Sequence, residues 1–315
     1  MSQSAVNPVV LVVSSEEVRE RIDRLLADRG IASRSTLARW IDGGRVTVQG
    51  RVVCKDYRVQ LGDQVKVVPA PPEPTAATPQ PLPLQILYED RDILVVDKAA
   101  GRVVHPAPGH PEGTLVNAIL FHCPDLQTKN GDPIRPGIVH RLDKDTSGVM
   151  VVAKSLDARA GLAETFAAHD LVRVYTAVVW GRPSDGTFDT LHGRSPSNRK
   201  KFSTRVLRGK RAVTHVRVKE PLGLASVVEC RLETGRTHQI RVHLSDGGYP
   251  IVGDRTYGRP PKDGALRAVD AQLGRQALHA GTLGFTHPCT GAALCFESPL
   301  PKDIEQVIET LSERA

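Results

Sequence analysis

The pattern of hydrophobic and polar positions divides the 315-residue chain into two regions with different periods. Residues 17–68 begin with helical spacing and end in short alternating strands. Gly30 is placed as the stop of a first helix, and Ser33 can cap a second. The core-facing positions of both helices are apolar: Ile22, Leu25, Leu26, Leu37, Trp40 and Ile41. We therefore expect two short helices followed by a small twisted sheet.

Residues 84–315 contain mainly strand-like segments. The stretches "QILY" and "DILVVD" flank an acidic turn and predict a hairpin. Later segments with a strand pattern are "GVMVVA", "VYTAVVWG", "AVTHVRV", "SVVECRLET" and "ALCFES". Helical spacing appears only between strands, at 115–121, 158–169 and 239–245. Because strands and helices do not alternate regularly, we predict an α+β domain with a mixed, largely antiparallel sheet.

Between the two regions lies the proline-rich stretch 69–83, "PAPPEPTAATPQPLP". Its seven prolines cannot donate backbone hydrogen bonds, and it has no run of large apolar residues. A proline-rich binding motif is one interpretation. Its position between two well-patterned regions favours a semi-rigid linker, which gives expected domains of 17–68 and 84–315.

Composition limits the partners and the compartment. The formal net charge is +7 and the isoelectric point about 9.3, which favours polyanionic partners. The cysteines are odd in number and form no CxxC pair, which argues against a disulfide framework or a cysteine-based zinc site. The apolar run 9–13 lacks a preceding basic stretch and is too short to cross a bilayer. We therefore expect a cytoplasmic protein with reduced thiols and no membrane partner.

Positive charge is concentrated in residues 194–219, which hold ten Lys and Arg and no acid. A solvated hairpin can carry several of these cations, but ten unopposed charges repel one another. A polyanion would relieve this repulsion, and each phosphate contact would make binding depend on salt. We expect contacts to nucleic acid here, with Arg199, Lys200 and Lys201 among the residues that make them.

The segment 137–154, "GIVHRLDKDTSGVMVVAK", places Asp143 and Asp145 two residues apart. A calcium loop would need a glutamate at its twelfth position, where the chain has Lys154. An aspartyl phosphatase would need an apolar strand running directly into the first acid, and it would need a later pair of acids. A zinc hydrolase is disfavoured because His238 and His243 lie five apart with no HExxH glutamate. The chemistry that remains is attack on carbon by a single carboxylate.

Four motifs in this order resemble the RluA/RluD-type pseudouridine synthases: "HRLDKDTSG", "LETGRTHQIRVHL", "YPIVGDRTYG" and "QALHAGTLGFTHP". In addition, "ASRSTLARWIDGGRVTVQGR" resembles the alpha-L RNA-binding module of a small-subunit ribosomal protein. The resemblance covers residues 17 to about 304, and it is greatest to the branch that modifies large-subunit ribosomal RNA. One departure is Ala99, where the family usually has proline.

The resemblance implies roles for individual residues. Asp143 would be the essential catalytic residue, and Tyr175 would lie against the target base. Arg241 would be the ion-pair partner of Asp143, with its planar guanidinium fixing both carboxylate oxygens. Asp145 would be a turn or cap residue whose carboxylate bonds nearby amides or Lys144.

The resemblance also implies contacts to RNA around the same cleft and in the N-terminal module. The residues expected to make them are His140, Arg141, Arg236, Thr237, His238, Lys98, Arg34 and Arg39. Lys98 has a second interpretation, as a support of the sheet, and the histidines have one as hydrogen-bonded orienting groups. Isomerisation of uridine takes no atoms or electrons from outside, so no metal or other cofactor is expected.

Two other functions stay open on the sequence. One is pseudouridine formation in transfer RNA, and the other is a non-catalytic RNA-binding factor in ribosome assembly. The expected partner is ribosomal RNA or a ribosome assembly intermediate, and the expected state is a monomer.

Overall fold

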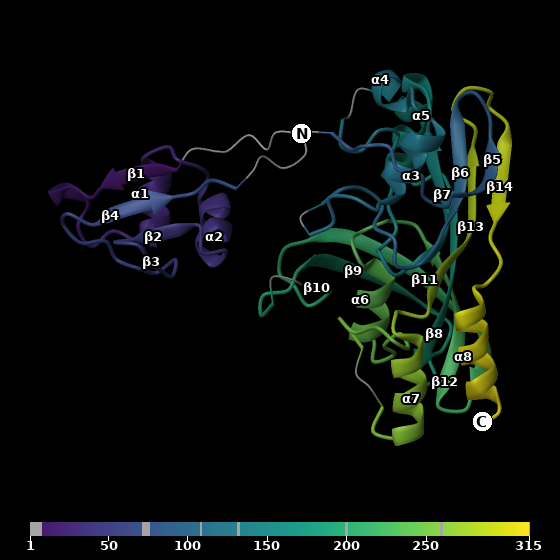
Figure 1. Ribbon diagram of the computed structural model, residues 1–315. Helices are drawn as coiled ribbons and strands as arrows, with labels where there is room; N and C mark the ends of the chain where they lie inside the picture. Colours follow the sequence, from purple (N-terminus) through teal and green to yellow (C-terminus); the bar gives the residue numbers. More distant parts are fainter. Residues whose placement is uncertain are drawn as a thin grey trace. The chain divides into compact units, whose positions relative to one another are not determined.

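A computed structural model describes residues 8–70, 76–107, 109–130, 133–198, 201–258 and 261–314 (Figure 1). The chain divides into two compact units, Met1–Pro74 and Thr75–Ala315. Within the described ranges, no helix is both long and apolar enough to cross a membrane.

The first unit contains the two predicted helices and a four-stranded sheet. The helices are α1 (Ile22–Asp28) and α2 (Arg34–Asp42), after a 3-10 turn at Ser15–Glu17. The sheet has the order β1-β4-β2-β3, formed by Val9–Val12, Gln64–Val67, Val46–Val48 and Arg51–Val52. As predicted, Gly30 ends α1 with φ of 71°, and the Ser33 side chain caps α2 by accepting from the Thr36 amide.

Strand β1 was missing from the predicted domain, which began at residue 17. The run 9–12 is too short to span a membrane, but its alternate residues pack inward against β4, with Val9 opposite Val67. The first unit therefore starts earlier than its helical pattern indicates.

The second unit is built on one large sheet, as the strand-rich pattern predicted. The order is β10-β9-β11-β12-β8-β13-β7-β6-β5, and β14 pairs with β13. In that order the strands are Phe202–Ser203, Gly186–Arg194, Lys210–Leu222, Ala225–Leu232, Val172–Trp180, Leu278–Thr286, Ser147–Ala153, Ile93–Lys98 and Gln85–Glu89, with Ala293–Glu297 as β14. Only β13 and β7 pair in parallel among the described strands, so the mixed, largely antiparallel sheet is confirmed.

Helices cover this sheet in two groups (Figure 1). Beside one half lie α3 (Leu115–His122), α4 (Leu126–Asn130) and α5 (Leu156–Ala168). Beside the other half lie α6 (Gln239–Asp246), α7 (Gly264–Leu273) and α8 (Lys302–Ser312). Strands β6 and β7 are apolar at successive positions because α3 packs on one face and α5 on the other.

The proline-rich stretch is a shorter spacer than predicted. Ala77 is buried, and its amide donates to the Pro133 carbonyl at 2.8 Å. The Gln80 amide donates to the carbonyl of Asn117, whose side-chain amide donates to the Thr78 carbonyl at 2.7 Å. The non-proline residues thus satisfy polar groups at the start of α3, and residues 76–83 belong to the second unit. Residues 71–75 lie outside the described ranges.

Candidate active site

Asp143 lies in the loop that enters β7. Its carbonyl accepts from the Thr146 amide at 3.2 Å, which closes a turn. Gly148, at the start of β7, has φ of 120°, and a Cβ there would lie 2.2 Å from the Ala280 carbonyl oxygen of β13. Only glycine allows this close approach of the two strands, and the approach fixes where the loop with Asp143 ends.

Asp145 supports the same turn in a different way from the one predicted. Its carbonyl, not its carboxylate, is held, because Arg275 Nη1 donates to it at 3.2 Å. The Asp145 carboxylate has no hydrogen bond or ion pair to any described residue. The predicted carboxylate bonds to amides or to Lys144 are therefore wrong, and the turn is held through backbone oxygen.

Arg241 reaches Asp143 from the third position of α6. Its Nη1 donates to Asp143 Oδ2 at 2.9 Å across 98 residues of sequence, so the predicted contact is confirmed. The predicted two-pronged geometry is wrong. Arg241 Nε and Nη2 instead bind the two carboxylate oxygens of Asp254, at 2.7 and 2.9 Å. The paired donors fix the arginine, and the single remaining donor reaches Asp143.

Asp254 is the residue of this network that the sequence reasoning missed. It is 4% exposed, and its Oδ1 also accepts from the amides of Thr256 and Tyr257. Burial acts to raise its pKa, but the bonds from Arg241 and the two amides outweigh burial, and the pKa is lowered. Burial likewise acts to lower the pKa of Arg241, yet Asp254 and Asp143 raise it overall. Asp254 and Arg241 thus form a buried ion pair that extends to Asp143.

His238 stands beside the Asp143 carboxylate at the N-terminus of α6, with φ of 58°. Its Nε2 lies 3.8 Å from Asp143 Oδ1, and its Nδ1 lies 2.8 Å from the Tyr257 hydroxyl. The Phe202 amide donates to that hydroxyl at 3.0 Å, and the hydroxyl proton is available to His238 Nδ1. Burial lowers the pKa of His238 although Asp143 opposes the shift.

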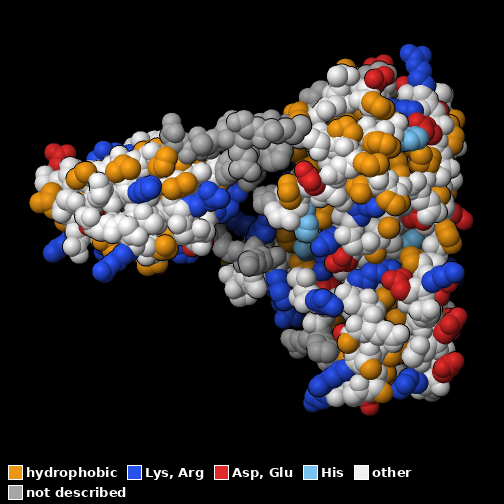
Figure 2. Space-filling view, viewed as in Figure 1, with side chains coloured by type: hydrophobic (Ala, Val, Ile, Leu, Met, Phe, Trp, Pro, Cys, Tyr) orange, Lys and Arg blue, Asp and Glu red, His pale blue; other side chains and the backbone are white. Residues whose placement is uncertain are grey.

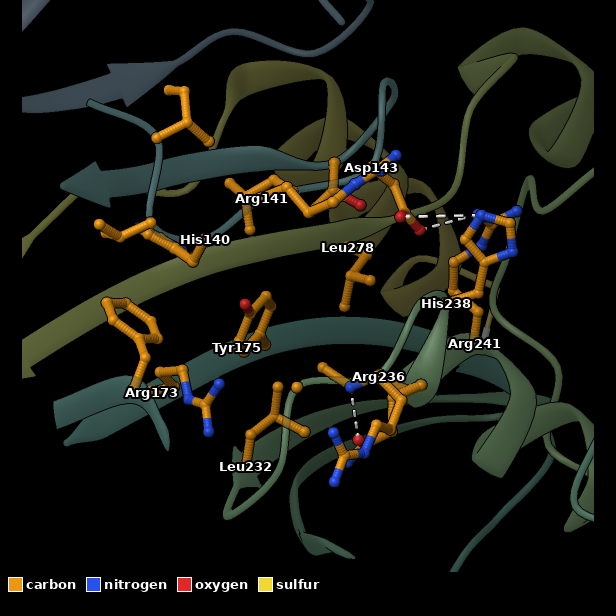
Figure 3. A pocket seen from close by; sticks show the side chains of 18 of the residues that line it. His140, Arg141, Asp143, Arg173, Tyr175, Leu232, Arg236, His238, Arg241 and Leu278 are labelled. Atoms are coloured by element: carbon orange, nitrogen blue, oxygen red, sulfur yellow. Dashed lines mark hydrogen bonds and ion pairs between the residues drawn. The ribbon is translucent and has the colours of Figure 1, made fainter. Parts of the chain in front are cut away.

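Asp143, His238 and Arg241 line one side of a cavity of about 600 Å³ (Figure 3). Tyr175 lies between Asp143 and Arg173 in the view, and Leu232 and Leu278 contribute apolar surface. Burial raises the pKa of Tyr175 to about 12, although Arg173 opposes the shift. Its hydroxyl makes no hydrogen bond to the described residues. The cavity therefore combines one held carboxylate with an aromatic surface suited to a planar ring.

The expected RNA contacts are only partly gathered at this cavity. His140, Arg141, Arg236 and His238 line it, whereas Thr237 is exposed at the start of α6. Lys201 Nζ lies 5.8 Å from the Tyr257 ring centre, and Arg199 and Lys200 lie outside the described residues. Arg34 and Arg39 are exposed on α2 of the first unit, where Arg34 pairs with Asp23 at 3.1 Å. Figure 2 shows Lys and Arg side chains scattered over one face of both units, with Asp and Glu among them.

Lys98 cannot serve as the predicted phosphate contact. It is 1% exposed, and Nζ donates to the carbonyls of Ala99, Arg102 and Lys144 at 2.9 to 3.0 Å. Its alternative interpretation, as a support, fits these bonds. Lys98 joins the end of β6 to the loop after Asp143, and it holds the carbonyl of Ala99, where the family usually has proline.

His140 fits its interpretation as an orienting group. The Val151 amide donates to its Nε2 at 3.0 Å, and its ring stacks on Phe166 with centres 4.5 Å apart. Burial lowers the pKa of His140 to about 3, with Arg173 adding to the shift. A neutral ring thus anchors the loop to β7.

One group of possible metal ligands occurs among the described residues, formed by Glu89, His122 and Cys123. Lys154 Nζ already lies 2.6 Å from Glu89 Oε1, so a cation occupies the carboxylate. None of these residues lines the cavity with Asp143. The group does not bear on the chemistry of the site.

Comparisons with known proteins agree with the geometry. Residues 92–246 match the family model described as RNA pseudouridylate synthase, and residues 20–65 match the S4 domain. An "Uncharacterized RNA pseudouridine synthase YlyB" of Bacillus subtilis is 47% identical over 308 residues, which cover 97% of this chain and 98% of the relative. The "Ribosomal large subunit pseudouridine synthase D" of Zymomonas mobilis is 44% identical, with 96% of each chain covered. The chain belongs to the RNA pseudouridine synthase family.

Solved structures support the same assignment. "Human RNA Pseudouridylate Synthase Domain Containing 1" matches with a TM-score of 0.54 and 26% identity, over 73% of this chain and 94% of that one. "Human RNA Pseudouridylate Synthase Domain Containing 4" matches with a TM-score of 0.55 and 27% identity, over 72% and 92%. The chain is an RNA pseudouridine synthase with an N-terminal S4 domain.

Proposed function

We propose that this synthase converts specific uridines of large-subunit ribosomal RNA to pseudouridine, with Asp143 as the essential catalytic residue. Relatives that are 42 to 45% identical carry the name "Ribosomal large subunit pseudouridine synthase D", which supports the substrate. The observation that carries the catalytic assignment is the single bond from Arg241 to Asp143 inside the cavity.

The reaction is an isomerisation in which the electrons balance within the substrate. The bond from uracil N1 to ribose C1′ breaks, the base turns, and C5 bonds to the same C1′. The hydrogen of C5 leaves as a proton, and N1 gains one. Asp143 acts by attack on C1′, by attack on the uracil ring, or by assisting a glycal; the proposal does not depend on which.

A uridine stacked in RNA cannot bring C1′ to a carboxylate inside a cavity. The target must leave the stack, which costs a few kcal/mol. Tyr175 offers a ring surface to the flipped base, and Arg141 and Arg236 at the same cavity offer charge to phosphates. In the proposal, contacts from Lys201, Arg34 and Arg39 add affinity without choosing the uridine.

Arg241 is a positioning residue in this proposal. It acts through Asp143, because Asp254 takes two of its donor nitrogens and leaves Nη1 for the catalytic carboxylate. A carboxylate held before substrate arrives needs no reorganisation in the transition state.

The test is to map pseudouridines by carbodiimide treatment and primer extension in RNA from cells that carry the wild-type gene, no gene, or Asp143→Ala. We expect a stop in large-subunit RNA that disappears in the last two strains. Asp145→Ala is the matched control and should keep the stop, since the Asp145 carbonyl survives the substitution. If every large-subunit stop persists in the deletion strain, the ribosomal proposal is wrong.

The same experiment separates the alternatives. Loss of a stop in transfer RNA instead would identify that substrate. If the deletion impairs ribosome assembly, Asp143→Ala restores it, and no stop changes in any strain, the protein is a non-catalytic assembly factor.

We also propose that the chain works as a monomer in the cytoplasm. The odd number of cysteines and the lack of a CxxC pair in the sequence fit a reducing compartment. Light scattering of the purified protein and fractionation of cells test the two statements separately.

A further inference from the structure

Arg173 is a buried cation that the chemistry described so far does not use. It lies on β8 two residues before Tyr175, so both side chains are on the same face of the strand. The residue is 7% exposed, yet it lines the cavity on the side away from Asp143 (Figure 3). Its Nη2 donates to the Glu233 carbonyl at 2.7 Å.

No described residue supplies a carboxylate for this guanidinium. Arg173 makes no ion pair in the described ranges, and its Nε is buried without a hydrogen-bond partner. Burial lowers the pKa of Arg173, and nearby Arg236 lowers it further. Arginine nevertheless stays protonated in proteins, so a charge is kept where its burial is uncompensated. A group that arrives with the substrate can supply the missing acceptor.

The surroundings of Arg173 are shaped for a flat ring. Its guanidinium carbon lies 5.9 Å from the ring centre of Phe166, which stacks on the neutral ring of His140. A Cβ on Gly235 would lie 2.6 Å from Arg173 Nη1, so only glycine at this position avoids a clash with the guanidinium. Leu232 adds apolar surface. A hydrated phosphate suits these neighbours poorly, whereas a pyrimidine with carbonyl edges suits them well.

We propose that Arg173 binds a carbonyl oxygen of the flipped uracil and stabilises the negative charge that the detached base carries. This inference rests on the proposed reaction. It assigns the binding of the uracil carbonyl to the part of the cavity opposite Asp143. When the N1–C1′ bond breaks, its electron pair stays with the base and spreads over N1, O2 and O4. The pair then forms the C5–C1′ bond, the C5 proton leaves, and N1 is protonated. Arg173 is thus a catalytic residue that touches the substrate and donates hydrogen bonds, and it takes no proton.

The experiment measures single-turnover conversion of a synthetic RNA stem-loop that contains the uridine found by mapping. The same oligonucleotide is prepared with 4-thiouridine or 2-thiouridine at that position, because sulfur accepts hydrogen bonds more weakly than oxygen. Arg173→Met should slow conversion of the uridine RNA about 100-fold, the usual loss on removing one charge-stabilising donor. RNA affinity and its dependence on salt should stay unchanged.

The decisive readout is coupling between the variant and the sulfur. One of the two thio-substrates should slow the wild type and have no further effect in Arg173→Met. Arg173→Lys keeps the charge with a different donor geometry, so it should give an intermediate rate and a reduced thio effect. It also keeps the test valid if Arg173→Met folds poorly.

The matched control is Arg231→Met. Arg231 is exposed on β12 opposite Val174, and it therefore lies on the other face of the sheet from Arg173 and Tyr175. It should convert all substrates like the wild type.

Three results would overturn the inference. Wild-type rates in Arg173→Met would exclude a role for the cation. Thio effects that persist in full in Arg173→Met, with a salt slope of RNA binding reduced by about one, would identify a phosphate contact instead. If the wild type does not convert the uridine RNA, the proposed function is wrong and the inference fails with it. The other two results differ from this one because the wild type is active in both.

Discussion

Two arginines line the same cavity, and their surroundings differ. Arg241 binds Asp254 with two donors and Asp143 with a third, whereas Arg173 has one carbonyl partner and no carboxylate among the described residues. Both are at least nine-tenths buried. The protein completes the hydrogen bonding on one side of the cavity and leaves it incomplete on the other.

The difference separates two uses of a buried charge. A charge whose partners are already present positions another group and changes little when substrate binds. A charge without partners lowers the stability of the free protein and regains that energy only through a ligand. The comparison therefore predicts that replacing Arg241 costs much more stability than replacing Arg173, although both replacements slow the reaction.

The largest expected effect is on folding. Arg241→Met should lower the free energy of unfolding by about 3 to 5 kcal/mol, because it leaves the buried Asp254 without its cation and removes the partner of Asp143. Arg173→Met should change it by less than about 1 kcal/mol, or raise it, since an unpaired buried charge is replaced by apolar atoms. Urea unfolding followed by Trp180 fluorescence measures both, with Trp40→Phe removing the signal of the first unit.

A loss of 3 kcal/mol or more in Arg173→Met would break the comparison. It would mean that the protein, and not the substrate, satisfies Arg173.

The next effect concerns rate. Arg241→Lys keeps the charge, but a single ammonium group cannot hold both oxygens of Asp254 and also reach Asp143. We expect single-turnover conversion to fall about 100-fold, the scale of a misplaced reacting group, with RNA affinity unchanged. Quench-flow and filter binding provide the two numbers.

Arg211→Lys is the control for that substitution. Arg211 makes a similar two-pronged pair with Asp189, but both residues are exposed. Wild-type turnover is expected, because exposed pairs contribute little. If Arg241→Lys also turned over normally, positioning by the guanidinium would not matter.

The fold was largely predictable because its signals are local. Period-two and continuous apolar runs marked the strands, and Ser33 and Gly30 marked helix ends. The order of strands in the sheet was not predicted, since pairing joins distant residues. Strands β1, β9, β10 and β13 and helices α4, α7 and α8 were also not predicted. The four-residue run at 9–12 becomes a strand only through β4.

The site was predictable only where a motif carried it. The contact between Asp143 and Arg241 was expected from resemblance, since no pattern links residues 98 apart. Asp254 stood in a quoted motif, and Arg173 stood two residues from Tyr175, yet neither was singled out. A sequence does not say whether an acid lies opposite a buried arginine, and that is the property that separates Arg173 from Arg241.

Lys98 is a third buried basic side chain. Unlike Arg241 it has no carboxylate partner, and unlike Arg173 it donates to three backbone carbonyls. Burial lowers its pKa to about 7, against the fields of Asp145 and Asp143. The unfolded chain keeps this proton up to about pH 10.4, so from pH 7 to 9 the unfolded state binds more protons. The contribution of Lys98 to the unfolding free energy therefore rises with pH, by about 2 kcal/mol over this window.

Lys98→Met removes that contribution. The unfolding free energy of the wild type minus that of the variant, measured in urea, should be about 2 kcal/mol more positive at pH 9 than at pH 7. A difference that stays flat would show that the three carbonyls keep Lys98 protonated throughout.

The smallest expected effect tests whether the residues that position Asp143 include Tyr257 and His238 as well as Arg241 and Asp254. Tyr257→Phe keeps the ring, whose centre lies 5.1 Å from the Arg241 guanidinium carbon, and removes the hydroxyl that bonds His238 and the Phe202 amide. His238 would lose its hydrogen bond to the hydroxyl, but Asp143 would keep its bond from Arg241. We therefore expect about a fivefold slower single turnover, equivalent to one hydrogen bond of about 1 kcal/mol. The half-buried Tyr249, in Tyr249→Phe, should show no loss. A loss above 100-fold would make His238 a group that acts on the substrate, and no loss would confine the positioning network to Arg241 and Asp254.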